Sequence, residues 1–404
     1  MSSMPTIQKF FLNFQPMMRY LKLFLLFISV STQAQSLREI NYSYRYNPAE
    51  PFSFAMKPQR SATGWNMHYR LQLRDTSILH TDEFVIRWDV RKDLSDKEGI
   101  LIKPERIAKS MDNFTIEGNV GLDISADTQI VVVRVLNNVA KRAWLFWQLV
   151  DPNYPVDGII INQYKSVLDN YIKTGTKSII QSADSTKVIS YYNDNFPAAA
   201  PGFSEGLARV SPLMNDDSTY SLPTNTEIDF TLKGLYLVQK DTSETHGFSF
   251  RVEEDYPRFE KVESLADPLI YVCTKQEYDR VKNAKGDKRA FDKVVLSITG
   301  DANRAKTFMR SYFKRVETAN QLFTSYKEGW KTDRGMIYII FGLPDQVFAF
   351  TDREVWTYNT QFDISFNFTK SSTIFDPDNY VLIRDKKYTE TWYEVIDLWR
   401  NARF

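Results

Sequence analysis

Hydrophobic and polar residues alternate along the first part of the chain, in short runs that polar turns separate. Runs such as "HYRLQL" and "VIRWDV" have a period of two, which is typical of a sheet with one buried and one wet face. Six runs at short spacing predict a β-sandwich domain over residues 37–151. The six runs are residues 39–46, 65–73, 83–90, 113–120, 128–137 and 142–150.

A linker and a second β-rich domain follow. The stretch "DPNYPVDG", residues 151–158, contains two prolines and a glycine, which interrupt regular structure. Strand-like runs such as "EIDFTLKGLYLVQ" and "GFSFRVEEDYP" then predict a second β-rich domain over residues 159–257. Residues 196–223 carry four prolines and are interpreted as a long surface excursion, either a binding loop or an ordinary connector.

The pattern becomes helical after Pro257. Residues 267–284, "DPLIYVCTKQEYDRVKNA", predict a strand and then a helix. One long amphipathic helix is predicted from Asp301, which caps it, to Gly329, which ends it in a left-handed conformation. Its apolar residues recur every three or four positions and predict a single buried stripe. The stripe consists of Ala305, Phe308, Tyr312, Val316, Ala319, Phe323 and Tyr326.

The segment "GWKTDRGMIYIIFGLPD", residues 329–345, holds three of the 15 glycines. It predicts a turn, a buried strand "MIYIIF" and a second turn "GLPD". Trp330 is expected to pin the first turn to the long helix, and Asp333 to accept backbone N–H groups or pair with a cation. An antiparallel meander over residues 352–384 and a final helix over residues 388–400 complete a predicted α+β domain. In that helix Trp392, Val395, Ile396 and Trp399 are expected to face inward.

These motifs resemble a known family. "YFKRVETANQLF", then "EGWKTDRGMIYIIFGLPD" and later "EVWTY" are similar to the GWxTD domain of bacteria, over about residues 259–404. Leu343 stands where many relatives have Pro. The resemblance implies an exported protein of a Gram-negative envelope with strand-rich regions before the domain, and no assigned activity. Residues expected to be structural or binding are Gly329, Trp330, Thr332, Asp333, Arg334, Gly335, Gly342, Pro344, Asp345 and Trp356.

The N-terminus predicts export. Arg19 and Lys22 flank an apolar stretch of about ten residues, and small residues precede a cut after Ala34, which is the pattern of a secretory signal peptide. The stretch is too short for a membrane-spanning helix, which needs roughly 20 residues. No cysteine lies near the cut, so a periplasmic protein rather than a lipoprotein is expected. Residues 1–16 are interpreted as an upstream extension of the reading frame.

Composition limits the possible partners. Lys plus Arg number 51 against 50 for Asp plus Glu, and no basic run of five or more occurs, so nucleic acid is not an expected partner. The single cysteine, Cys273, excludes an internal disulfide and any Cys-x-x-Cys metal site. It is expected to be a buried thiol in a strand.

No sequence motif assigns chemistry to the chain. His68, His80 and His246 lack metal-binding spacing, and "KTGTKS" at residues 173–178 lacks the first glycine of a phosphate loop. We therefore expect no cofactor and no metal. Carboxylates remain: Asp333, Asp345 and Glu354 lie near turns, where capping and ion pairing compete with acid–base catalysis. Asp376 and Asp378 are interpreted as a solvated turn rather than a cation site.

The sequence thus favours a multidomain, non-enzymatic periplasmic protein: β-sandwich regions followed by an α+β domain, binding an envelope protein or a glycan. Peripheral association with the outer membrane is also considered, and the oligomeric state stays open. One alternative is a hydrolase of an envelope polymer that uses Asp333 or Asp345, whose pKa values should then be raised in an open cleft. The other is an accessory of outer-membrane protein assembly, suggested by a short "GLPD" and "EVWTY" likeness to small assembly lipoproteins.

Overall fold

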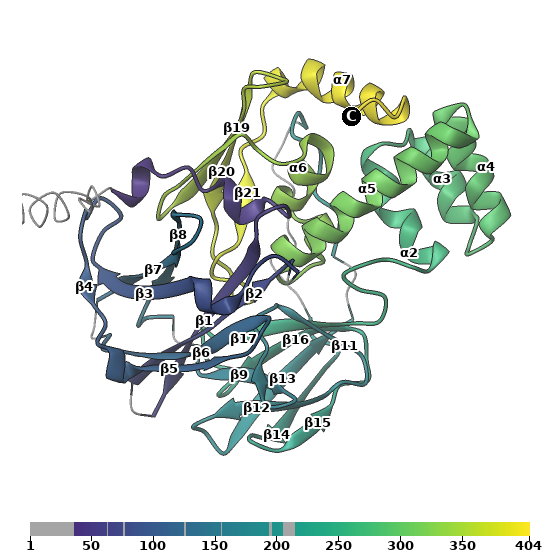
Figure 1. Cartoon of the computed structure of the whole chain (residues 1–404). Coiled ribbons are helices and arrows are strands. Elements are labelled where there is room, and N and C mark those ends of the chain that lie inside the picture. The colour runs from purple at the N-terminus through teal and green to yellow at the C-terminus, as the bar shows by residue number, and fades with distance from the viewer. Residues whose placement is uncertain are drawn as a thin grey trace, which may run out of the picture.

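The computed structural model describes residues 36–62, 64–75, 77–124, 127–154, 156–193, 196–204 and 215–404. Within these residues the chain forms two β-rich regions and a C-terminal region of helices and a further sheet (Figure 1). The predicted signal peptide, residues 1–34, lies outside the described residues, as do residues 205–214 of the predicted excursion. None of the helices in the described part is long and apolar enough to span a bilayer.

The first β-rich region contains eight strands in two antiparallel sheets. They are β1 (Phe52–Ser61), β2 (Gly64–Leu73), β3 (Phe84–Arg91), β4 (Ile100–Leu101), β5 (Ile107–Met111), β6 (Thr115–Leu122), β7 (Gln129–Asn137) and β8 (Arg142–Val150), with short 3₁₀ turns η3 (Thr81–Glu83) and η4 (Pro104–Arg106). The strand orders are β1-β2-β6-β5 and β4-β3-β7-β8. Met67 and Val120 of the first sheet share one core with Trp88 and Val133 of the second, because alternate side chains of a strand point to the same face.

The second β-rich region contains nine strands. They are β9 (Gly158–Asn162), β10 (Lys165–Ser166), β11 (Tyr171–Lys173), β12 (Lys177–Ser182), β13 (Thr186–Tyr192), β14 (Ser218–Pro223), β15 (Glu227–Asp229), β16 (Gly234–Gln239) and β17 (Phe248–Glu253). Their sheet orders are β10-β9-β12-β15 and β11-β17-β16-β13-β14. All residues of β16 and β17 are buried. One face of this pair lies on the region's own core, while Leu235 and Leu237 pack toward Tyr326 and Phe375 of the C-terminal region.

The C-terminal region combines helices with a four-stranded antiparallel meander of order β18-β19-β20-β21. Its elements are α2 (Val262–Ala266), η5 (Asp267–Tyr271), α3 (Lys275–Asn283), α4 (Lys288–Thr299), α5 (Ala302–Phe323), η6 (Gly329–Lys331), α6 (Asp333–Phe341), β18 (Gln346–Ala349), β19 (Arg353–Tyr358), β20 (Ile364–Lys370), β21 (Tyr380–Leu382), η7 (Lys386–Tyr388) and α7 (Thr389–Arg400). In α5 the predicted stripe from Phe308 to Phe323 is buried, and Asp301 caps the helix by accepting from Asn303 N and Arg304 N. In α7, Trp392, Val395 and Trp399 are buried, whereas Ile396 is only partly buried.

The predicted first strand, residues 39–46, is wrong. The segment forms the short 3₁₀ turns η1 (Leu37–Glu39) and η2 (Ser43–Tyr46) and packs against the C-terminal region. Tyr42 N donates to Val347 O at 2.8 Å, and the Tyr46 hydroxyl donates to Glu354 at 2.7 Å. Its alternating tyrosines therefore bury their rings in a distant core rather than on one face of a sheet.

The predicted strand "MIYIIF" is also wrong, because these residues lie in α6. Helix α6 packs against α5, β21 and α7, so it has no wet face and its sequence shows no helical period. A short run that is apolar throughout cannot be assigned to strand or helix from periodicity alone. Gly342, with φ of 84°, leads the chain out of this helix rather than out of a strand.

Helix α5 ends six residues earlier than predicted, at Phe323. Thr324 follows it in an extended conformation, so Gly329 is not the left-handed residue that ends the helix. Instead Gly329 opens η6 and lies directly against α5. A Cβ at this position would fall within 2.6 Å of Asn320 Cα, which backbone atoms cannot relieve by a rotamer change. Only glycine fits this close approach.

Two smaller predictions also need correction. The residues before α3 form η5 and not a strand, so Cys273 lies in a turn, although burial still raises the pKa of its thiol to about 12. Part of the predicted surface excursion packs against the C-terminal region. Phe196 packs edge-on to Tyr326 with ring centroids 5.1 Å apart, and Ala199 N donates to Lys331 O at 3.0 Å. Residues 218–223 form β14, at the edge of a sheet.

The close approach at Gly329 predicts a large and specific effect of one added methyl group. We expect Gly329→Ala to lower the free energy of unfolding by about 2 kcal/mol or more, since backbone must move to accommodate the Cβ. Urea denaturation followed by tryptophan fluorescence measures this change. Gly121→Ala is the control, because the nearest atom to its new Cβ lies 3.8 Å away. Equal stability of the two variants would contradict the packing described.

Candidate functional site at the domain junction

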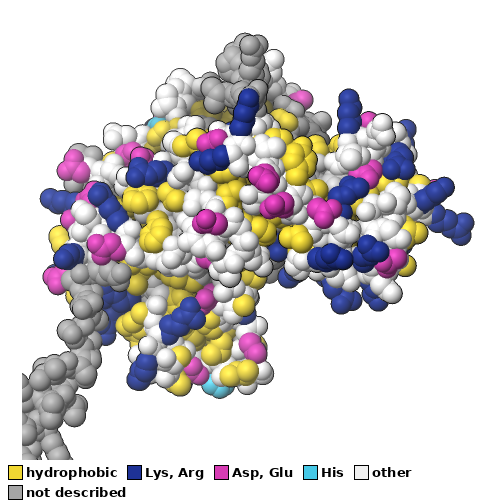
Figure 2. Space-filling view, turned by 90° about the horizontal axis from the view of Figure 1, so that it is seen from above, with side chains coloured by type: hydrophobic (Ala, Val, Ile, Leu, Met, Phe, Trp, Pro, Cys, Tyr) yellow, Lys and Arg dark blue, Asp and Glu magenta, His cyan; other side chains and the backbone are white. Residues whose placement is uncertain are grey.

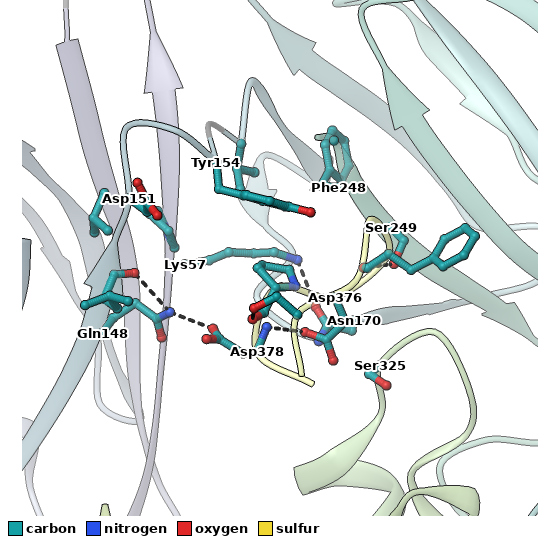
Figure 3. Close-up of a pocket in the computed structure, with 18 of the residues that line it drawn as sticks. Lys57, Gln148, Asp151, Tyr154, Asn170, Phe248, Ser249, Ser325, Asp376 and Asp378 are labelled. Carbon is teal, nitrogen blue, oxygen red and sulfur yellow. Dashed lines mark hydrogen bonds between the residues drawn. The ribbon is translucent and has the colours of Figure 1, made fainter. Parts of the chain in front are cut away.

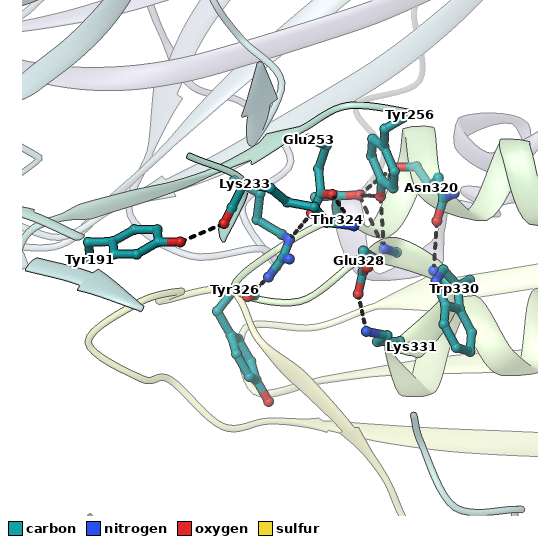
Figure 4. A network of polar contacts seen from close by, with 12 residues as sticks. Tyr191, Lys233, Glu253, Tyr256, Asn320, Thr324, Tyr326, Glu328, Trp330 and Lys331 are labelled. Carbon is teal, nitrogen blue, oxygen red and sulfur yellow. Dashed lines mark hydrogen bonds and ion pairs between the residues drawn. The ribbon is translucent and has the colours of Figure 1, made fainter. Parts of the chain in front are cut away.

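The loop after α5 folds back onto that helix and onto the end of the second β-rich region. Asn320 Oδ1 accepts a hydrogen bond from Trp330 N at 3.0 Å. The Tyr256 hydroxyl accepts from Gly329 N at 3.0 Å and also hydrogen-bonds to the Thr324 hydroxyl. Figure 4 shows these side chains gathered around the loop. Since the groups are buried, each hydrogen bond replaces one that water would otherwise make.

Charged side chains lie on both sides of the contact between the same loop and β17. Arg251 Nε lies 2.7 Å from Glu253, whose other oxygen is 3.1 Å from Lys233 Nζ. Glu328 forms an ion pair with Lys331 (Figure 4). Burial opposes the ionisation of Glu328, but the charges of Arg251 and Lys331 outweigh it and lower its pKa. Arg251 Nη1 also donates to Tyr326 O at 2.9 Å and so joins β17 to the loop. Displacing the two regions would break this hydrogen bond and separate Arg251 from the charge of Glu328.

Trp330, Thr332 and Gly335 have structural roles. The Trp330 side chain is 3% exposed and lies edge-on to Tyr271, with ring centroids 6.1 Å apart. Thr332 Oγ1 accepts from Gly335 N at 3.0 Å and so caps the start of α6. Its hydroxyl also donates to Gly329 O at 2.8 Å. These residues specify a turn and a helix start.

Asp333 is held within the fold as well. One carboxylate oxygen accepts from Leu382 N at 2.8 Å, and the other lies 2.6 Å from Arg384 Nη2. The residue is 8% exposed. A buried, ion-paired carboxylate differs from the acid in an open cleft that the hydrolase alternative requires of Asp333.

Arg334 and Trp356 meet at the buried Glu354. The carboxylate lies 3.4 Å from Arg334 Nη1 and accepts from Trp356 Nε1 at 3.2 Å. Arg334 also stacks over the Tyr380 ring, 4.3 Å from its centroid. The partners of Glu354 are therefore provided by η2, α6 and β19, and they hold the N-terminal segment and the helix on the meander.

The "GLPD" residues form the turn between α6 and β18. Gly342 N donates to Tyr338 O at 2.9 Å, and Pro344 is buried. Asp345 is exposed and accepts from Thr360 N at 2.8 Å, which bridges two turns. The ten motif residues thus belong to one structural unit, and none of them lines the cavity at the junction of the three regions.

That cavity, of about 450 Å³, lies where all three regions meet (Figure 3). β1 and β8 form one wall, the linker around Tyr154 another, β17 a third, and the loop between β20 and β21 the fourth. Its aromatic residues are Trp65, Tyr154, Phe248 and Phe375, and its polar residues include Lys57, Gln148, Asp151, Asn170, Ser249, Ser325, Lys370, Asp376 and Asp378. A concave site with an aromatic lining and a few convergent polar groups is the usual form of a small-ligand site.

Two carboxylates in this cavity have shifted pKa values in opposite directions. Burial and the neighbouring Asp378 raise the pKa of Asp376 to about 6. Burial also opposes ionisation of Asp378, but Lys370 at 2.6 Å and the Gln148 amide at 2.8 Å outweigh it and lower its pKa. The Ser325 hydroxyl lies close enough to Asp376 to moderate its pKa, yet makes no hydrogen bond of good geometry and is buried. Shifted acids in a cavity indicate a functional site.

Lys57 is one of two partly buried cations that line the cavity, together with Lys370. Figure 3 shows its side chain passing beneath Tyr154 toward Asn170 and the Asp376 loop. Its Nζ donates to Asn170 Oδ1 at 3.1 Å. Burial lowers the pKa of Lys57 to about 8, and Asp169 and Asp376 only partly offset this effect. The cavity therefore offers a donor near neutral pH beside acceptors on Asp376 and Asn170.

The interpretation of Asp376 and Asp378 as a solvated turn needs correction in part: both residues line the junction cavity, although the Asp378 side chain is still 42% exposed. The local sequence, rich in Asp, Pro and Asn, is that of an exposed turn, and it carries no sign that two other regions close over it. A cation site is not indicated either, because the described residues contain no group of three or more His, Cys, Asp or Glu arranged for a metal ion. Lys57 lies within a strand that the sequence pattern did not reveal.

The three histidines lie apart from the cavity lining. His68 is buried in β2, where Gln59 and Ser166 bond to its ring nitrogens at 2.7 and 2.9 Å, and burial lowers its pKa to about 4. His246 lies 3.1 Å from Glu244 in a turn. Residues 173–178, "KTGTKS", run from the end of β11 through a turn into β12. None of these features brings catalytic groups together.

Comparison with protein families matches residues 234–401 to the GWxTD domain. The chain carries a GWxTD domain. This confirms the resemblance found in the sequence. No curated protein matches the chain. Among solved structures, a titin I-band fragment (15% identity, TM-score 0.17) and a titin Z1Z2 tandem chimera (13% identity, TM-score 0.17) each cover 50% of this chain. The match spans 65% of the first structure and 98% of the second, and such low TM-scores support no argument about fold.

The matched range of the GWxTD domain begins at Gly234, so it includes β16 and β17. This start agrees with the contacts that β17 and Tyr256 make with the motif loop. Glu253 and Arg251 of β17 belong to the charge network around Glu328, and Tyr256 holds the motif loop. The structural unit of the GWxTD domain is therefore the helices and meander together with the strand pair that seats the motif.

The raised pKa of Asp376 predicts a pH-dependent stability. The native state binds more protons than the unfolded state between about pH 4 and 6, so the contribution of Asp376 to stability falls as pH rises through this window. We expect Asp376→Asn to be more stable than the wild type by about 1–3 kcal/mol at pH 8 and equally stable near pH 4. Urea denaturation at both pH values measures this difference. Asp363→Asn, in an exposed turn, is the control; a gain independent of pH would contradict the assignment.

Proposed function

We propose that this protein is a non-enzymatic protein of the periplasmic cell envelope that binds a glycan or protein partner, with the junction cavity as a glycan-binding site. Support for export comes from the signal-peptide pattern around Arg19 and Lys22, and the lack of a cysteine near the cut supports a protein without lipid attachment. The absence of a recognisable catalytic motif in the sequence supports binding rather than turnover.

We further propose that both β-rich regions are β-sandwiches. In the first region, two four-stranded antiparallel sheets contribute side chains to one shared core. Such an arrangement buries one face of each sheet and leaves the other for solvent or partners. The second region has the same two-sheet plan, although β11 and β17 pair in parallel.

The observation that carries the binding proposal is the mixture of side chains in the cavity. A sugar ring presents hydroxyl groups that need both donors and acceptors, and C–H faces that pack on aromatic rings. Lys57, Asn170 and Asp376 supply such donors and acceptors, while Tyr154 and Phe248 supply aromatic surface. A volume of about 450 Å³ suits one or two sugar units by the usual scale of ligand pockets.

Calorimetric titration with envelope glycan fragments, such as muropeptides and lipopolysaccharide core oligosaccharides, tests this proposal. We expect at least one fragment to bind, and Phe248→Ala and Asp376→Asn each to weaken that binding about tenfold or more, as expected for a lost ring contact or charge-assisted hydrogen bond. Asp363→Asn should leave the affinity unchanged.

In parallel, a photo-crosslinker at Tyr154 in cells identifies proteins that contact the cavity. A crosslinked protein without glycan binding would favour a protein partner, and a barrel protein would favour the assembly alternative.

A second candidate function, hydrolysis of an envelope polymer, is favoured by the opposed pKa values of Asp376 and Asp378. One protonated and one ionised carboxyl group are what a general acid and its partner require. The candidate acids are therefore these two residues rather than the ion-paired Asp333 or the exposed Asp345.

Incubation of the protein with purified peptidoglycan, followed by chromatography of released fragments, tests the hydrolase candidate. If the non-enzymatic proposal is right, no fragments are released by the wild type. Release that Asp376→Asn and Asp378→Asn each reduce by about 100-fold or more would instead establish hydrolysis, since loss of one general acid or base typically costs this much. Release that persists in both variants would indicate a contaminating enzyme.

A further inference from the structure

Helices α3 and α4 and the first half of α5 form a lobe at one end of the molecule (Figure 1). This basic lobe, defined as residues 275–310, contains ten Lys or Arg and five Asp or Glu. The remainder of the chain has 41 Lys or Arg against 45 Asp or Glu, so the near-neutral total hides a positive lobe on an otherwise negative chain. The sequence has no basic run here, because acidic and apolar residues lie between the cations.

All ten cations of the basic lobe are exposed. They are Lys275, Arg280, Lys282, Lys285, Lys288, Arg289, Lys293, Arg304, Lys306 and Arg310. Three of them pair with a carboxylate: Lys282 with Asp267, Lys288 with Asp292, and Arg304 with Asp301. The other seven have no ion-pair partner among the described residues.

The acidic residues of the basic lobe mostly serve its own structure. Glu277 is largely buried and pairs with Arg400 at 2.8 Å. Asp287 and Asp301 cap the helices that follow them. Their charges are therefore directed at backbone N–H groups or a partner cation, while the unpaired cations project into solvent. Figure 2 shows Lys and Arg side chains standing out from this end of the molecule.

An apolar side chain lies among these cations on α4. Arg289, Lys293 and Leu296 follow at intervals of four and three residues, so they share one face of the helix. Leu296 is 43% exposed. A cationic helix face that also presents an apolar residue is the pattern of segments that bind at the headgroup level of a bilayer.

We propose that the basic lobe docks the protein onto the anionic headgroups of a lipid bilayer. The cations are spread over a protruding end rather than lining a groove, which suits a broad charged surface more than the backbone of a single nucleic acid. Polybasic segments gain affinity for such a surface in proportion to their number of cations. No residue of the basic lobe lines the junction cavity, so a docked molecule would keep that cavity open to a ligand.

Co-sedimentation with vesicles tests this inference, using the mature chain from Gln35 onward. The probes are vesicles of phosphatidylcholine with 30 to 40% phosphatidylglycerol, and vesicles of phosphatidylcholine alone. The charge-reversed variant is Arg289→Glu, Lys293→Glu and Lys306→Glu, at exposed helical positions where Glu is also a good helix former. The matched control, Lys92→Glu, Lys97→Glu and Lys103→Glu, makes the same change in net charge at exposed positions of the first β-rich region.

We expect binding to the anionic vesicles only, weakened by raising the salt from 0.1 to 0.5 M. Charge reversal in the basic lobe should reduce the affinity for anionic vesicles about 100-fold or more, and the control reversal should reduce it much less. Leu296→Ser should reduce this affinity several-fold. No binding to anionic vesicles, or equal losses in the two reversed variants, would overturn the proposal. The proposal would also be overturned if the protein bound a 20-base-pair DNA duplex more tightly than anionic vesicles and Leu296→Ser left that binding unchanged. Near-UV circular dichroism confirms that each variant is folded.

Discussion

The close approach of Gly329 to helix α5 is the constraint on which the rest of the C-terminal region depends. With no side chain between them, the loop backbone reaches Asn320, whose amide accepts from Trp330 N, and the Tyr256 hydroxyl, which accepts from Gly329 N. Trp330 is thereby placed in the core and Thr332 at the start of α6. The glycine, tryptophan and threonine of the motif thus belong to one packing arrangement, in which the position of each residue depends on the other two.

Buried charges also lie at the contact between this unit and the second β-rich region. Arg251, Glu253, Glu328 and Lys331 are all buried, and burying charges is costly unless every one is paired. The apolar contacts of Leu235 and Leu237 would tolerate sliding along the interface, whereas the hydrogen bond from Arg251 to Tyr326 O and the attraction between Arg251 and Glu328 favour one arrangement. Apolar packing therefore supplies the attraction between the two regions, and these polar contacts favour a specific register.

Periodicity predicts the parts of this fold that have one wet and one dry face. The stripe of α5 follows that rule, and so does α7, with Ile396 at its border. Strand β3, which contains "VIRWDV", follows it only in part, because Asp89 and Arg91 on its polar face are buried as an ion pair. The failures share one physical cause. Helix α6 is buried on all sides. The segment from Leu37 to Tyr46 buries Leu37, Tyr42 and Tyr46 in a distant core, and Gly329 serves a contact rather than a left-handed turn. In each case a partner far away in the sequence, rather than local preference, decides the structure.

The candidate site could not be predicted from the sequence for the same reason, and its position links it to the motif. Lys57, Asn170 and Asp376 come from three regions, and none has a local pattern that indicates the other two. Yet Ser325, in the cavity wall, and Trp330, in the core, belong to the same short loop. The fold-back that Gly329 permits carries Ser325 toward Asp376, while Arg251 donates to Tyr326 O beside it at 2.9 Å. A motif without a side chain in the cavity can therefore still set the shape of that cavity, because it fixes the loop from which one wall is built.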